Sequence, residues 1–155
     1  MNKVVGALTW VALAMCAVSA QAQVRLAEPA EYGLFVTPQQ ELEPGERLLT
    51  LRAPSLQTTD QIPARLGTKF GLRMRLAGKQ VGETPLTLLY LTPGVVTPDG
   101  VRHDKFELLQ KVTPELEQEV MAFEFTENYE LVPGEWHFLV FQGDRKIAEQ
   151  RFEVR

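Results

Sequence analysis

The stretch that decides the fold is residues 70–76, Phe-Gly-Leu-Arg-Met-Arg-Leu. Its even-numbered positions are Phe, Leu, Met and Leu, whereas the odd-numbered positions are Gly, Arg and Arg. Successive side chains of a strand point to opposite faces of a sheet, so this period of two predicts a strand with one buried and one wet face. Residues 121–125 alternate in the same way, with Met and two Phe separated by Ala and Glu.

Two further stretches, 86–91 and 136–141, are apolar at almost every position. Such runs are typical of strands that are covered on both faces. Gly143 and Asp144 separate the second run from the last apolar stretch, and both residue types tolerate the positive φ of a tight turn. The sequence therefore predicts a closing hairpin that turns at residues 142–145.

Turn residues, chiefly Pro and Gly, recur at short intervals between these runs. Short, evenly spaced strands with such punctuation indicate an all-β sandwich or barrel. Residues 113–119 have a helix-start pattern, but the segment is too short for more than a turn or two. We expect seven or eight strands in a single domain over 31–155, preceded by a flexible arm over 23–30. The expected strands are 31–37, 46–53, 68–77, 84–92, 104–112, 118–126, 135–142 and 146–154.

The first 22 residues predict where the protein works. Lys3 precedes an apolar run over residues 4–15, and small residues lead to Ala20-Gln21-Ala22. This is the build of a secretory signal peptide, which predicts a mature chain that begins at Gln23 and is periplasmic or secreted. The run is shorter than the roughly 20 apolar residues of a membrane span. Lipid anchoring through Cys16, which stands in a lipobox-like sequence, is the alternative.

Cleavage after Ala22 leaves 133 of the 155 residues, the size of one ordinary domain. It also removes Cys16, the only cysteine, so we expect no disulfide. Without Lys3 the chain has 15 Lys+Arg against 20 Asp+Glu, and its basic residues form no cluster. This balance predicts no nucleic-acid partner and no stable membrane insertion after cleavage.

The residues for catalysis or metal binding are scarce. The histidines are His103, which we expect in an exposed polar turn, and His137, which we expect to face away from its apolar neighbours on a strand. Ser55 is the only serine after cleavage, so a catalytic triad has little material. The sequence predicts no catalytic residue, no metal and no cofactor. Two alternatives stay open: a copper carrier that uses histidine with Met74 and Met121, and a small hydrolase or lyase that uses two carboxylates on an envelope polymer.

Two separated motifs carry a family resemblance. Residues 62–71 read I-P-A-R-L-G-T-K-F-G, and residues 130–136 read E-L-V-P-G-E-W. In this order they resemble a family of uncharacterised bacterial exported domains with I-P-A-x-L-G-x-x-F-G and E-L-V-P-G-x-W segments. The resemblance implies an exported β-sandwich without an assigned activity. The closing Pro-Gly-x-Trp hairpin is also similar to the last hairpin of immunoglobulin-like domains, so the expected fold is an immunoglobulin-like antiparallel β-sandwich.

Physical chemistry gives both motifs a structural role. Pro63 restricts the preceding Ile62 to extended backbone. In residues 132–135, Pro followed by Gly predicts a type II turn, which would direct Trp136 into the core.

Because the sequence shows no recognisable combination of catalytic residues, it predicts a non-enzymatic domain that binds a protein, a peptide or an envelope component. The predicted binding residues are Asp60, Gln61 and Arg65, within a loop over residues 57–68 that proline and glycine stiffen. Arg65 would offer a planar cation to a carboxylate or phosphate. In the competing structural interpretation, Ile62 and Leu66 close one end of the sandwich and Arg65 points into water. Strand addition at an exposed sheet edge is the other mode of recognition that we consider.

Overall fold

The computed structural model describes residues 23–36 and 54–155. In these ranges it has β-strands and one short 3-10 helix, η1 (Asn128–Glu130), which confirms the all-β class. The predicted signal peptide, residues 1–22, and the predicted strand 46–53 lie outside the described residues. Within the described ranges, no helix has the length and apolar character needed to cross a membrane.

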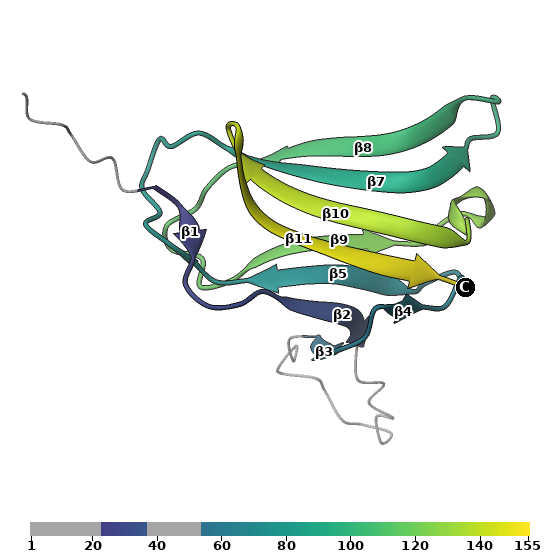
Figure 1. The fold of residues 1–155 in the computed structure, drawn as a ribbon, viewed down its shortest axis with the longest axis horizontal. Coiled ribbons are helices and arrows are strands. Elements are labelled where there is room, and N and C mark those ends of the chain that lie inside the picture. The colour runs from purple at the N-terminus through teal and green to yellow at the C-terminus, as the bar shows by residue number, and fades with distance from the viewer. Residues whose placement is uncertain (1–22, 37–53) are drawn as a thin grey trace, which may run out of the picture.

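Two facing sheets make up most of the fold (Figure 1). The larger sheet has the strand order β4 (Gln61–Ile62), β11 (Arg145–Val154), β10 (Gly134–Gln142), β7 (Leu86–Val96) and β8 (Arg102–Gln110). The smaller sheet has the order β3 (Ser55–Gln57), β2 (Glu31–Val36), β5 (Lys69–Met74) and β9 (Glu119–Glu124). A third, two-stranded sheet pairs β1 (Arg25–Leu26) with β6 (Leu76–Ala77).

Strand pairing is antiparallel except between β4 and β11, which run parallel, with Ile62 opposite Val154. The expected antiparallel pairing is therefore wrong for this one pair. The physical reason is that β4 reaches the larger sheet by a crossing from β3 in the smaller one, so no hairpin fixes its direction.

Residues 23–30 do not form the expected flexible arm. Arg25 pairs with Ala77 and Leu26 with Leu76, while the side chain of Val24 is fully buried. The guanidinium of Arg145, on the closing hairpin, donates to the carbonyl oxygen of Val24. Burial and pairing hold this segment, and neither is visible in its local composition.

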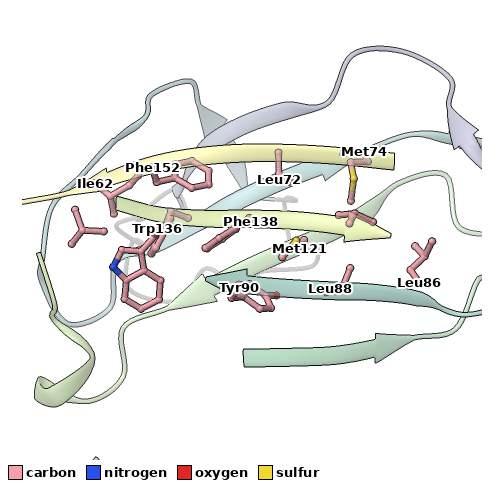
Figure 2. Close-up of a cluster of buried hydrophobic side chains, with 14 of the residues drawn as sticks. Ile62, Leu72, Met74, Leu86, Leu88, Tyr90, Met121, Trp136, Phe138 and Phe152 are labelled. Carbon is pink, nitrogen blue, oxygen red and sulfur yellow. The ribbon is translucent and has the colours of Figure 1, made fainter. Parts of the chain in front are cut away.

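The core lies between the two large sheets, and aromatic rings fill its centre (Figure 2). The ring of Phe70 on β5 lies 5.2 Å from Phe138, 5.2 Å from Phe152 and 6.0 Å from Trp136, measured between centroids. These three partners come from the opposite sheet, so Phe70 joins the two layers. Trp136 is fully buried, which confirms its predicted place in the core.

The predicted turns have mixed outcomes. The closing hairpin turns at residues 142–145 as expected, with Gln142 opposite Arg145 and a φ of +57° at Gly143. Gly134 also has a positive φ, +122°, but it begins β10 opposite Val154, so the expected type II turn is not present there. Residues 113–119 form one hydrogen-bonded turn, from the Leu116 N–H to the Thr113 carbonyl, with no helix.

The outer face of the larger sheet keeps apolar side chains at its middle. Leu139 on β10 is 9% exposed, whereas its neighbours Leu89 and Leu91 on β7 are partly exposed. These strands were predicted to be covered on both faces. In the described part of the chain, the outer cover is incomplete.

Candidate functional site

The crossover segment, residues 57–68, connects the two sheets. The chain leaves β3 in the smaller sheet, forms β4 at the edge of the larger sheet, and returns to the smaller sheet as β5. Pro63 follows β4 directly and fixes the backbone at the point where the chain turns back. The segment therefore lies across one side of the sandwich.

Backbone hydrogen bonds fasten the crossover segment to the larger sheet. The N–H of Glu153 donates to the carbonyl of Asp60 at 2.8 Å, and that of Arg155 donates to Ile62 at 2.9 Å. The N–H of Ala64 donates back to the carbonyl of Arg155 at 2.7 Å. Sequence reasoning missed this role of β11, because parallel pairing between distant strands leaves no local signal.

A second set of bonds fastens the segment to the smaller sheet. The N–H of Gly67 donates to the carbonyl of Phe125 at 2.7 Å, and the N–H of Phe125 donates to Thr68 at 3.0 Å. Between the two anchors the side chain of Ile62 is 1% exposed and belongs to the core, whereas Leu66 is 51% exposed. Of the two residues expected to close this end of the sandwich, only Ile62 does so.

The three predicted binding residues are all exposed on this anchored backbone. The side-chain amide of Gln61 donates to the Asp60 carboxylate at 3.0 Å, so these two form one polar group before Pro63. Arg65 lies two residues after Pro63, and in the described ranges its guanidinium forms no ion pair. The structure thus pairs Asp60 with Gln61, and it does not bring Arg65 into contact with either.

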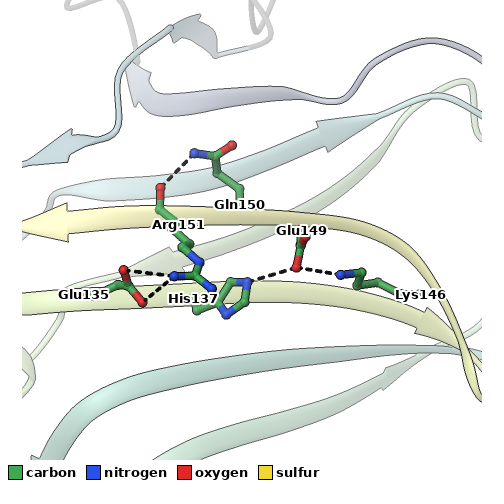
Figure 3. Close-up of polar contacts among 6 residues, drawn as sticks. All are labelled: Glu135, His137, Lys146, Glu149, Gln150 and Arg151. Carbon is green, nitrogen blue, oxygen red and sulfur yellow. Dashed lines mark hydrogen bonds and ion pairs between the residues drawn. The ribbon is translucent and has the colours of Figure 1, made fainter.

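The histidines lie apart from this segment. His137 is on the outer face of β10, where its Nε2 lies 3.3 Å from the Glu149 carboxylate (Figure 3). The ammonium group of Lys146 donates to the same carboxylate at 2.8 Å, and this contact, with His137, lowers the pKa of Glu149. The neighbouring Arg151 pairs with Glu135 at 3.4 Å. The face carries exposed ion pairs, which contribute little to stability.

His103 is not in an exposed turn as predicted. It lies within β8, is partly buried, and its ring stacks on that of Phe106 with 5.5 Å between centroids. The pairing of β8 with β7 begins at Arg102, two residues before the expected start of this strand at residue 104.

The residues invoked for copper lie in different parts of the fold. Met74 and Met121 are 2% and 0% exposed and belong to the core, as their alternation predicts. His137, by contrast, is on the outer face of the larger sheet. Within residues 23–36 and 54–155, no group of three or more His, Cys, Asp and Glu side chains is placed to hold a metal ion.

An open hollow of about 730 Å³ lies at the end of the sandwich near the closing hairpin. Its lining includes the two carboxylates Glu83 and Asp144, so it is the place where the hydrolase alternative would find two acids. Arg145, which also lines it, donates to Val24 and Gln142. The guanidinium of Arg145 is therefore already used to hold the N-terminal segment in place.

Comparison with known proteins identifies a family. The model of a family described as a domain of unknown function (DUF3859) matches residues 23–154. The chain is similar to an immunoglobulin-like protein from Pseudomonas aeruginosa, at 55% identity and a TM-score of 0.75, over 88% of this chain and 99% of that one. None of the curated proteins matches.

Two larger structures show only a remote likeness. An alkylpurine DNA glycosylase from Pseudomonas fluorescens is 16% identical, with a TM-score of 0.32, over 81% of this chain and 30% of its own. A β-glucosidase from Listeria innocua is 12% identical, with a TM-score of 0.31, over 77% and 21%.

Proposed function

The chain belongs to the DUF3859 family of domains of unknown function, and from that premise we propose that it is an exported, non-enzymatic binding module. Its relative with 55% identity is described as immunoglobulin-like, which supports the β-sandwich fold. The proposed ligand is a protein, a peptide or another envelope component, bound at the crossover segment. The observation that carries the proposal is a backbone anchored to both sheets, with exposed polar side chains on it.

Anchoring matters because binding costs entropy. A loop that is already fixed before binding loses little conformational freedom when a partner arrives, so more of the contact energy appears as affinity. Arg65 supplies a permanently charged planar donor for a carboxylate or phosphate of the partner. Asp60 and Gln61, on the other side of Pro63, supply an acceptor and a donor for a peptide backbone.

Export is part of the proposal. The family match begins at residue 23, directly after the predicted cleavage site. Intact-mass analysis of the protein from an envelope fraction tests this step. A mature chain that begins at Gln23 supports it, and a lipid adduct on Cys16 would replace it with the anchored alternative.

The binding test uses two matched pairs of variants. Arg65→Ala and Asp60→Ala change the crossover segment, while Arg25→Ala and Asp144→Ala remove the same charges from exposed positions elsewhere. Each immobilised protein is exposed to the envelope fraction, and captured components are identified by mass spectrometry. We expect the first pair to lose a component that wild type and the control pair retain. Identical capture by all five folded proteins contradicts the assignment of the site.

A further inference from the structure

The strand β8 is the outermost strand of the larger sheet, and among the described residues one of its edges has no paired strand. In the described part of the chain its only sheet neighbour is β7 (Figure 1). The strand is nine residues long. An exposed edge of this length presents a row of free N–H and C=O groups to another strand. It lies at the end of the sheet opposite β4, and therefore away from the crossover segment.

Apolar side chains are exposed on both faces of this edge. Leu108 stands opposite the buried Leu88, on the face toward the other sheet, yet it is 57% exposed. Leu109, on the outer face, is 70% exposed. Proteins usually protect an edge of this kind with charges, a bulge or a covering element. The charges of β8 lie mainly in its first half, and the second half ends in Leu-Leu-Gln.

The order of charges on β8 is complementary to itself. Phe106 is the central residue of Arg102–Gln110. If two copies of β8 pair antiparallel about Phe106, Lys105 of each copy stands directly opposite Glu107 of the other. Both are on the outer face and are largely exposed, 66% for Lys105 and 51% for Glu107, and they are 4.0 Å apart within one chain. Opposite charges directly across a strand pair stabilise it.

From this complementarity we infer that the occupant of the β8 edge is a second copy of this chain. The two larger sheets then join into one ten-stranded sheet about a two-fold axis at Phe106. Leu108 falls diagonal to Phe106 of the second copy, within reach for packing. In a two-fold contact of this type, the β8 edges of the two copies pair with each other, and no free β8 edge remains for a third copy. The contact therefore yields a dimer and no fibre.

Charge reversal tests this register. In a homodimer of Lys105→Glu, the new carboxylate faces Glu107 of the other copy twice, and in a homodimer of Glu107→Lys, two ammonium groups face each other twice. We expect either variant to raise the dimer dissociation constant by at least about tenfold, measured by sedimentation equilibrium of the exported protein. Glu115→Lys, a charge reversal at an exposed loop position, is the control and leaves the constant unchanged.

Mixing the two single variants is the decisive arm. A heterodimer of Lys105→Glu with Glu107→Lys restores two attractive pairs across the interface, although each chain has lost its own internal pair. We expect the mixture to dimerise where neither variant does alone. The inference is overturned if the wild type is monomeric up to about 1 mM, or if the mixture remains monomeric. A monomeric wild type would mean that the partner of the β8 edge is an extended segment of another protein. The test is independent of the proposed binding site, because β8 and the crossover segment lie at opposite ends of the larger sheet, and we expect Arg65→Ala to leave dimerisation unchanged.

Discussion

The indole Nε1 of Trp136 donates a hydrogen bond to the carbonyl oxygen of Val132 at 3.0 Å. The ring is fully buried against Phe125 and Phe70, so its one polar atom is satisfied by the segment that leads into β10. Buried indoles usually find such a partner.

Replacement of Trp136 separates its packing from its hydrogen bond. We expect Trp136→Ala to lower the free energy of unfolding by about 3–5 kcal/mol. Trp136→Phe keeps a ring but strands the Val132 carbonyl, and we expect a loss of about 1–3 kcal/mol. Urea unfolding followed by circular dichroism measures both. In a protein that begins at Gln23, Trp136 is the single tryptophan, and a red-shifted native emission maximum would contradict the buried placement.

Gly71 is required for close approach of two strands. A Cβ at this position would stand 2.0 Å from the carbonyl oxygen of Met121 on β9. We expect Gly71→Ala to cost more than about 3 kcal/mol or to prevent folding. The control is Gly82→Ala, which meets open space and carries only the strain of a φ of +80°, about 1–2 kcal/mol. Thermal unfolding compares the two; equal losses would show that β5 and β9 can separate.

The Lys79–Glu119 pair is buried, with side chains 7% and 1% exposed and charged atoms 3.6 Å apart. Lys79→Met leaves a buried carboxylate without its cation, so we expect a loss of about 3–5 kcal/mol. Removing both charges in Lys79→Met/Glu119→Leu should cost less than the first change alone, because no charge is stranded. A double-mutant cycle by urea unfolding measures the coupling. Additive losses would mean that the pair does not act as a unit.

Tyr90 gives the fold an alkaline limit. Burial raises the pKa of its hydroxyl from 10.0 to about 12, and the hydroxyl donates to the Ala122 carbonyl at 3.2 Å. Since the folded state holds this proton more tightly, the contribution is complete below pH 10 and is lost as the pH rises toward 12. Tyr90→Phe should be about 1 kcal/mol less stable at pH 7 and lose stability less steeply between pH 10 and 12. Parallel stability curves for both proteins in that window would contradict this assignment.

Local patterns predicted the strands better than their partners. The alternation in residues 70–76 correctly predicts extended backbone with Phe70, Leu72 and Met74 in the core. It does not reveal that the strand breaks at Arg75, because β6 turns away to pair with β1. The same limit applies to β4, whose parallel partner is over ninety residues away in sequence.

The candidate site shows a similar division. Pro63 correctly indicated extended backbone at Ile62, since it restricts the dihedral angles of the residue before it. Gly67 has a φ of +79°, which glycine adopts without strain. The hydrogen bonds that hold this backbone, from Glu153, Arg155 and Phe125, come from strands that no local pattern links to it. Leu108 is likewise exposed although it lies on the face of β8 that points toward the other sheet. The reason is that β8 is the outermost strand, which no local pattern reveals.

The place of β11 between β10 and β4 has a consequence for how the chain acquires its structure. The larger sheet cannot close until β11 has been synthesised, because β4, made some ninety residues earlier, has no sheet neighbour without it. Until β11 has been synthesised, the sheet that contains the apolar strands β7 and β10 is incomplete, and these strands are prone to aggregation. Folding dominated by such distant pairing is slow, on the order of milliseconds to seconds. A chain of this topology therefore spends its vulnerable period after synthesis, when a holding chaperone could still keep it unfolded.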